Sequence, residues 1–320
     1  MKKSFASLLI LASLLVNAQQ NQQLYQMHYL AESNFLNPAI QNECKIFVGL
    51  PLISSLHVNY ANSAFSYRQL VENTSDTTSA LLIDRRVNRL GWRSFIGTEI
   101  HFTWLALGYK LNDYYIGFSV IEKNNIPVTI SRDLLMLPWM GNAPFEGENG
   151  SSRGTGVYGM HYREYALGAS KKTGEDDYVG IKAKLLFGKL NIALPRSNVT
   201  LYTDPVSFAL NLEGDIRMNI SAPVIIGEED GRIRDVVVDE NASIVPLIFN
   251  RKNWGFAIDA GFIHQYNSRV SLSGSVVDLG FIRWRSNLNN LESTEHFSYQ
   301  GVLADSGNVF ESILDSVTFT

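Results

Sequence analysis

Residues 206–221 read VSFALNLEGDIRMNIS, and apolar and polar side chains alternate along this stretch almost without a break. Leu210 and Ile216 fall on one face, whereas Glu213 and Arg217 fall on the other. Successive side chains of a β-strand point to opposite faces, so a period of two gives the strand one apolar side and one polar side. A helical winding would scatter the same charges around its axis. The stretch therefore predicts one long strand.

The same alternation recurs through much of the chain. It is found in residues 96–104, 178–191, 256–262 and 270–276. Turn-forming residues separate the runs and predict three hairpins, over residues 105–123, 161–190 and 254–284. A helical turn is predicted at 131–141, and loops are predicted at 141–156 and 227–234. The chain is therefore expected to be all-β and antiparallel.

Composition excludes several classes of protein. The chain has 320 residues, of which 45% are hydrophobic and 18% charged, against about 25% charged in average globular proteins. A single cysteine excludes a disulfide framework and a cysteine-based zinc site. The formal net charge of −4 gives no sign of a basic patch, so we expect no nucleic-acid partner. Low charge together with 17 Phe and 14 Tyr favours extended strands with aromatic ends.

The first eighteen residues have the pattern of a secretory signal peptide. A basic start at Met1–Lys3 precedes an apolar run over residues 5–16, and Ala18 provides a small residue for cleavage. The run is too short to cross a bilayer core, which takes roughly 20 residues. We therefore expect Sec-dependent export, with the signal peptide cleaved near Ala18.

Two all-β architectures are compatible with such strands. A soluble β-sandwich hides the apolar faces between two sheets, whereas a transmembrane β-barrel turns them to lipid. The predicted strands run to about twelve to sixteen residues, beyond the usual 5–6 of globular proteins, and a tilted membrane strand needs about 9–11. Aromatic residues near strand ends, such as Trp104, Tyr114 and Tyr178, suit a lipid–water boundary. The antiparallel transmembrane barrel is therefore the favoured fold.

Isolated charges in the middle of the strands predict which side chains face the lumen. Each lies on the polar face of an alternating run, and a barrel interior is polar. The lumen-facing candidates are Glu99, His101, Lys182, Lys184, Glu213, Asp215, Arg217 and Asp259.

Four further segments carry a resemblance to a known group of proteins. Residues 23–27 (QLYQM) and 34–39 (NFLNPA) stand before the first strand, and the run from Trp254 to Phe262 is followed by DLGFIRW at 278–284. These segments resemble Bacteroidota outer-membrane barrels related to the long-chain fatty-acid transporter and to type IX secretion and gliding proteins. They are most similar to an uncharacterised family of such barrels. The resemblance implies that Asn37, Pro38 and Ala39 belong to a small plug inside the barrel.

The expected organisation has three parts. Residues 1–18 form the signal peptide, 19–44 the plug-like segment, and 45–320 the outer-membrane barrel. Barrels of this group usually finish on a strand with a terminal aromatic residue, whereas Phe319 is not last here. A barrel that is incomplete at its C-terminus is therefore kept as an alternative, because open edges would leave backbone groups unpaired in lipid.

The sequence contains no His-Glu-x-x-His metal motif, no phosphate-binding loop and no Gly-x-Ser-x-Gly nucleophile elbow between a strand and a helix. Glu99 and His101 share a strand face and offer two metal ligands, but a polar lumen explains them more simply. We therefore expect no enzyme activity, no cofactor and no metal. The expected role is a transporter or channel for small or hydrophobic solutes, or a membrane scaffold of secretion or gliding machinery. The alternative is a secreted soluble β-sandwich, such as an adhesin or carbohydrate binder, and a secreted hydrolase comes third.

Overall fold

Strand pairing dominates the computed structural model, and every pairing between named strands is antiparallel. Thirteen of the strands within the described part of the chain hydrogen-bond into one sheet, and β9 and β10 form a separate hairpin. The all-β prediction is confirmed. The structure describes residues 22–27, 29–51, 54–64, 91–175, 177–229, 232–238, 250–267, 270–294, 296–299 and 317–319. The predicted signal peptide lies outside these residues.

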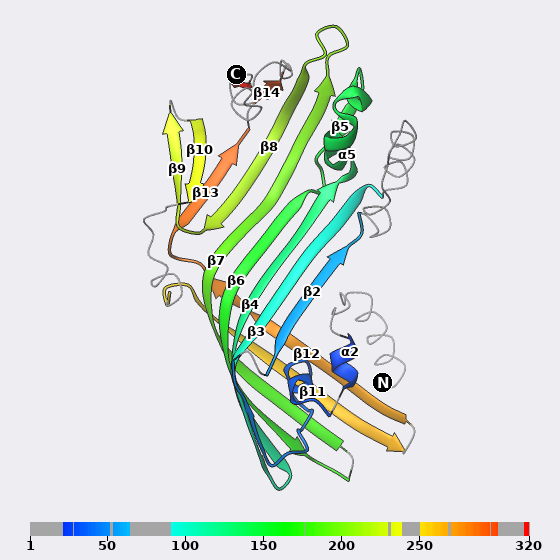
Figure 1. Ribbon diagram of the computed structural model, residues 1–320, viewed down its shortest axis with the longest axis vertical. Coiled ribbons are helices and arrows are strands. Elements are labelled where there is room, and N and C mark those ends of the chain that lie inside the picture. Colours follow the sequence, from blue (N-terminus) through cyan, green and yellow to red (C-terminus); the bar gives the residue numbers. More distant parts are fainter. Residues whose placement is uncertain are drawn as a thin grey trace, which may run out of the picture.

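The helices are short and the strands are long (Figure 1). The helical segments are α2 (Gln22–Gln26), η1 (Ala31–Phe35), α5 (Arg132–Met140) and η2 (Ala143–Phe145). The strands are β1 (Ile46–Gly49), β2 (Leu56–Asn62), β3 (Arg93–Leu111), β4 (Tyr114–Ser131), β5 (Asn149–Ser151), β6 (Gly156–Lys172), β7 (Asp177–Thr203), β8 (Leu210–Ser221), β9 (Val224–Glu229), β10 (Arg232–Val238), β11 (Trp254–Asn267), β12 (Val270–Arg283), β13 (Leu288–Ser293), β14 (His296–Tyr299) and β15 (Val317–Phe319). In the described residues, no helix is both long and apolar enough to cross a membrane.

All three predicted hairpins are confirmed. They are β3–β4, β6–β7 and β11–β12, each closed by a turn of two to four residues. In the β3–β4 turn Asn112 has φ 52°, a left-handed conformation that Asn tolerates better than most residues. The predicted helical turn is α5, which begins after Ser131, whose side chain accepts a hydrogen bond from Leu134 N and caps the helix.

Three predictions of local structure are wrong, and one of them is the loop at 141–156, which contains η2 and β5. Residues 206–209 do not extend β8 but lie in its turn with β7, where Phe208 adopts φ 58° and Asp204 Oδ1 accepts hydrogen bonds from Val206 N and Ser207 N. The charged stretch at 227–234 is not a simple loop, because parts of β9 and β10 pair across it. At residues 206–209 the hydrogen bonds of the turn end the strand although the sequence still alternates. At residues 227–234 the backbones of β9 and β10 pair although the side chains are charged.

The sheet forks because two long strands change partners along their length. The first part of β7 pairs with β11, and the part from Asn191 onward pairs with β8. In the same way β3 pairs with β1 near its end and with β2 near its start. We call the part that contains β1, β11 and β12 the lower half, and the part that contains β2, β8 and β13 the upper half (Figure 1).

A buried asparagine ties the two branches together at the fork. The backbone O of Asn253 accepts a hydrogen bond from Gly188 N at 2.7 Å, and its side-chain Oδ1 accepts from the N–H groups of Arg285 and Ser286. Asn253 is completely buried. The fork is therefore a fixed junction in which the buried polar groups are satisfied.

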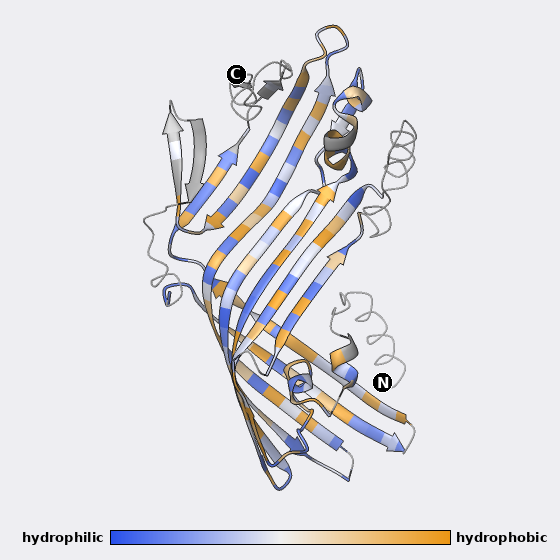
Figure 2. Cartoon of the chain, viewed as in Figure 1, coloured by the Kyte–Doolittle hydropathy of each residue, from blue (hydrophilic) through white to orange (hydrophobic). Residues whose placement is uncertain are grey.

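Hydrophobic and hydrophilic residues alternate along the strands of the lower half (Figure 2), and because successive side chains of a strand point to opposite sides, its two faces differ chemically. On the outer face, large apolar side chains are exposed, among them Leu107, Ile116, Leu167, Ile181, Phe256 and Leu279. On the inner face, small and charged side chains are buried beneath the N-terminal segment. No pairing between the described strands joins β1 or β2 to β12 or β15, so the described part of the sheet stays open along these edge strands.

Candidate functional site

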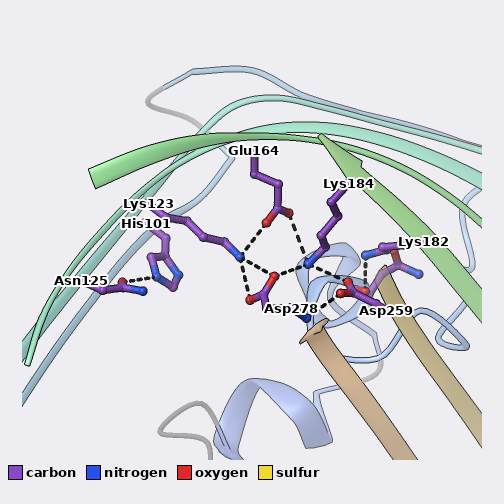
Figure 3. A network of polar contacts seen from close by, with 9 residues as sticks. His101, Lys123, Asn125, Glu164, Lys182, Lys184, Asp259 and Asp278 are labelled. Carbon is purple, nitrogen blue, oxygen red and sulfur yellow. Dashed lines mark hydrogen bonds and ion pairs between the residues drawn. The ribbon is translucent and has the colours of Figure 1, made fainter. Parts of the chain in front are cut away.

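Five charged side chains from five strands meet on the inner face of the lower half (Figure 3). This inner ionic network consists of Lys123 of β4, Glu164 of β6, Lys184 of β7, Asp259 of β11 and Asp278 of β12. Lys184 Nζ lies 2.6 Å from Asp278 Oδ1 and 2.7 Å from Asp259 Oδ2. Lys123 Nζ lies 2.9 Å from Glu164 Oε2 and 3.1 Å from Asp278 Oδ2. The network therefore links β4, β6, β7, β11 and β12, which are five consecutive strands of the sheet.

The contact between Lys123 and Asp278 crosses the interior. Along the sheet, β4 and β12 are four strand spacings apart, because β6, β7 and β11 lie between them. At about 4.8 Å per spacing, the path along the sheet is about 19 Å. A contact of 3.1 Å between the two side chains requires the sheet to curl until its inner surfaces face each other. The network therefore fills the interior at this level.

Most of the charged side chains of the inner ionic network are buried, so each needs an opposite charge nearby. Lys123, Glu164, Lys184 and Asp259 are all buried, and Lys182 lies two residues from Lys184 on the same face of β7. Lys123 and Lys184 each lie between carboxylates, and this placement offsets part of the cost of removing the charges from water. Asp278 is placed by a bulge between β11 and β12 and has φ 57°, and its N–H donates to Asp259 Oδ1 at 2.8 Å.

The N-terminal segment is held against the inner face of the lower half. Lys182 Nζ donates a hydrogen bond of 2.5 Å to the backbone O of Asn34, and Ser275 Oγ of β12 donates to Leu36 O at 2.7 Å. Asn37, Pro38 and Ala39 are fully buried. Asn37 Oδ1 accepts a hydrogen bond from Ala39 N, which closes a local turn, and Asn37 Nδ2 donates to Phe262 O of β11. The three residues assigned to a plug thus lie inside the curve of the sheet.

Two glycines make room for this segment. A Cβ atom at Gly180 of β7 would collide with the carbonyl O of Pro38, and one at Gly261 of β11 would collide with Asn37 Oδ1. The backbone of the segment therefore approaches the strands more closely than any larger residue permits.

A cavity of about 180 Å³ lies between the network and the N-terminal segment. Glu99 and His101 line it, and His101 Nε2 is 3.0 Å from Asn125 Oδ1, while its ring centroid is 5.4 Å from that of His57. Leu24, Phe35 and Leu36 supply an apolar wall. A wider opening of about 570 Å³ shares Leu24, Ser55 and His57 with this cavity. The interior thus contains an amphipathic space.

The structure divides the sequence-predicted polar residues into three groups. Lys184 and Asp259 belong to the network, and Lys182 lies beside it. Glu99 and His101 line the adjoining cavity. The three candidates on β8 lie apart, because Asp215 pairs with Arg196 at 2.6 Å, Arg217 pairs with Glu292 at 2.7 Å, and Glu213 is opposite Thr200 and His296. The described residues contain no group of three or more His, Cys, Asp or Glu side chains placed to hold a metal.

Three members of the network were missed from the sequence. The predicted hairpin over residues 105–123 ends at Lys123, whereas β4 continues to Ser131. Glu164 lies within a predicted hairpin whose alternation places it beside Tyr162 and Ala166 on one face, a signal that was present. Asp278 follows a bulge that shifts the phase of the alternation, so counting by two does not place it.

Comparison with known proteins gives one match. Residues 38–319 match the model of a family described as "Family of unknown function (DUF5723)". No curated protein matches the chain, and no solved structure matches it. The match begins within the Asn37–Ala39 element and extends through β15. Since it covers most of the 320 residues, the chain belongs to this family of unknown function, DUF5723.

Proposed function

We propose that this chain is an outer-membrane β-barrel protein whose interior is closed by its own N-terminal segment. The observation that carries the proposal is the outer face of the lower half. Leu167, Ile181 and Leu279 are 59%, 67% and 62% exposed, respectively, and they come from three different strands. Apolar side chains exposed across a whole sheet face are unfavourable in water, whereas lipid accommodates them.

The inner face supports the same arrangement. A soluble sandwich would pack the apolar face of the sheet against a second sheet and leave charged residues in water. Here the charged residues are buried inside and the apolar ones are exposed outside. This inversion is expected of a protein whose outer solvent is hydrocarbon.

The closed interior favours a scaffold over an open channel. The ionic network and the segment around Asn37 occupy the space inside the curve of the lower half. Small barrels of about eight strands are filled by side chains and leave no aqueous pore. In line with the resemblance described above, the proposed role is a membrane scaffold for secretion or gliding machinery.

Transport of a small hydrophobic or amphipathic solute is the second candidate. It is favoured by the cavity of about 180 Å³, which joins an apolar wall at Leu24 and Phe35 to polar groups at His57 and His101. In this case the N-terminal segment would have to move during passage.

Cell fractionation of the full-length protein tests the membrane assignment. We expect the protein in the outer-membrane fraction, resistant to extraction with alkaline carbonate, with a gel mobility that changes on boiling in SDS. A protein recovered in the soluble fraction as a compact monomer would contradict the proposal and favour the soluble sandwich.

Reconstitution separates the two roles. A scaffold with a closed interior is expected to give no steady conductance in planar bilayers and no uptake of a fluorescent long-chain fatty acid into vesicles. Uptake by the wild-type protein that is lost in the His57→Ala and His101→Ala variants, with unchanged membrane insertion, would favour the transporter.

A further inference from the structure

Three polar side chains of β2 and β3 line the interior cavity of about 180 Å³. His57 of β2 lies directly opposite His101 of β3 in the strand pairing, and Glu99 lies two residues before His101 on the same face. Their neighbours Val58 and Ile100 point outward and are exposed, so the alternation of the strands turns the three polar side chains inward. Two paired strands thus build a polar wall of the cavity.

Two groups on this wall have hydrogen-bonding capacity that the described residues do not use. The carboxylate of Glu99 forms no hydrogen bond or ion pair with another described residue. His57 Nε2 is buried and has no hydrogen-bond partner in the described part of the chain, whereas His101 Nε2 lies 3.0 Å from Asn125 Oδ1 (Figure 3). Buried polar groups without partners are costly, so a ligand that donates to both groups would be stabilised here.

The charges around the cavity favour a cation. The described residues that line it include three carboxylates, those of Glu99, Glu164 and Asp278, and one lysine, Lys123. Lys123 Nζ is already shared between Glu164 at 2.9 Å and Asp278 at 3.1 Å. Glu99 therefore adds a negative charge that this lysine does not pair, and a positive ligand group is attracted to it.

Another wall of the cavity is apolar and belongs to the N-terminal segment. It consists of Leu24 of α2, Phe35 of η1 and Leu36. The hydrogen bond of 2.7 Å from Ser275 Oγ to Leu36 O holds this wall against β12. A ligand of this cavity therefore meets acidic and apolar surfaces at once.

The volume of the cavity limits the size of its ligand. An apolar cavity of about 150 Å³ binds benzene, so this cavity of about 180 Å³ has room for one ring with a short polar group. The wider opening of about 570 Å³ shares Leu24, Ser55 and His57 with the cavity and offers a route of entry.

We propose that this cavity binds a small amphipathic amine. Its ammonium group lies beside Glu99 and His57, and its apolar part, about the size of one ring, lies against Phe35 and Leu36. A primary ammonium is charged at neutral pH and donates three hydrogen bonds, enough for the carboxylate and for the neutral imidazole. The inference rests on the proposed function and names the class of solute for its second candidate, transport.

An NMR titration of the full-length protein in detergent micelles tests the assignment with three probes of similar shape. Benzylamine is a cation at neutral pH, benzyl alcohol is neutral and benzoate is an anion. Micelles without protein correct for the probes that dissolve in detergent. We expect the wild-type protein to bind benzylamine about tenfold more tightly than benzyl alcohol, and benzoate more weakly than either.

Two matched variants locate the site. In Glu99→Gln we expect the affinity for benzylamine to fall about tenfold, to that for benzyl alcohol, while the affinity for benzyl alcohol stays within about twofold. Unchanged binding of the alcohol shows that the cavity is intact. The control is Glu213→Gln, which removes an exposed carboxylate of β8 outside the cavity and is expected to leave all three affinities unchanged.

The outcomes separate this inference from the proposed function. Absence of binding, equal affinities for the three probes, or equal losses in Glu99→Gln and Glu213→Gln would overturn the amine site, even for a protein found in the outer-membrane fraction. Selective binding of benzylamine that depends on Glu99, in a protein recovered from the soluble fraction, would support the site and contradict the membrane assignment.

Discussion

Lys184 is the residue on which the inner ionic network depends most, because it contacts Glu164, Asp259 and Asp278. Its side chain is 3% exposed, and those of Glu164 and Asp259 are 3% and 0% exposed, so water does not replace the ammonium at these two carboxylates if it is removed. Lys184→Met keeps the length of the side chain but leaves buried negative charge unpaired. We expect a loss of roughly 3–5 kcal/mol in the free energy of unfolding. Urea titration in detergent micelles, followed by tryptophan fluorescence, measures it.

A second substitution and a control check the electrostatic origin of this loss. Adding Asp259→Asn to Lys184→Met removes one of the unpaired charges and is expected to restore part of the stability. Lys171→Met, which changes a lysine at the exposed end of β6, is expected to change stability by less than about 1 kcal/mol. Equal losses in Lys184→Met and Lys171→Met would show that the network is not stabilising.

Gly180 is the residue that sets how deeply the N-terminal segment is seated. In Gly180→Ala the new methyl group collides with the carbonyl O of Pro38, so the segment must shift away from β7. We expect residues 34–42 to become accessible to protease in the folded protein. Gly117→Ala on the neighbouring inner face is the control, because its nearest neighbour would be 3.5 Å away, an ordinary contact. Equal protection in both variants would argue against close packing at Pro38.

At the scale of elements, the β7–β8 turn is expected to respond to pH. Hydrogen bonds from the backbone N–H and the hydroxyl of Ser207 and from Val206 N hold the pKa of Asp204 below its usual range. A lowered pKa in the folded state means that the carboxylate stabilises the turn above the ordinary aspartate pKa of about 3.9. This contribution is lost as the pH falls further, through the lowered pKa.

Hydrogen exchange detected by mass spectrometry measures this response. We expect faster exchange of residues 203–209 in acid than at pH 7, after correction for the intrinsic pH dependence of exchange. Asp204→Asn cannot ionise, so its corrected exchange is expected to be the same at both pH values. A wild-type turn that is insensitive to pH would contradict the assigned role of Asp204.

The alternation of apolar and polar residues predicted the strands better than it predicted which side chains of different strands contact each other. A period of two placed Lys182, Lys184 and Asp259 on polar faces, because alternation holds wherever pairing is regular. It failed at Asp278, where a bulge adds a residue, and at Phe208, where a turn ends the strand. Bulges and turns depend on the partner strand, and a single run of sequence does not reveal its partner.

The sequence predicts the strand face on which a side chain lies more readily than what covers that face. Leu210 lies on the apolar side of its strand, as expected, but it is buried against Phe145 and Leu201. A substitution at Leu210 therefore would not test whether the apolar face contacts lipid. Ile181, which is exposed, is the better position for such a test. The covering residue Phe145 comes from η2, in a stretch predicted only as a loop, so its packing was outside the reach of strand periodicity.

For the whole molecule, the decisive question is which solvent surrounds the outer face. In Ile181→Arg a charge replaces a side chain that is 67% exposed in the middle of the lower half. In lipid we expect a loss of about 2–4 kcal/mol, whereas in water the change would be nearly neutral. Refolding into vesicles at increasing urea concentration measures the difference. The control is Ser273→Arg on the inner face, near the start of β12, where the side chain does not point to lipid in the proposed arrangement.

The fork of the sheet was not predictable at this scale. Each hairpin was found from local turns, but the exchange of partners along β7 involves strands that are far apart in sequence. The pairing of β7 is irregular at Lys189 and again between Ala193 and Arg196, but such irregularities do not tell which strand pairs on either side of them. The same holds for the contact between Lys123 and Asp278, which are separated by 155 positions.

The seating of the N-terminal segment has a consequence for the order of assembly. Asn37 donates to a residue 225 positions later, and Leu36 accepts from one 239 positions later. The seat is therefore made by the β11–β12 hairpin, which leaves the ribosome long after the segment itself. The polar groups of the N-terminal segment therefore lack their partners until the β11–β12 hairpin has been synthesised. A factor that delays folding until synthesis is complete would protect the segment during this time.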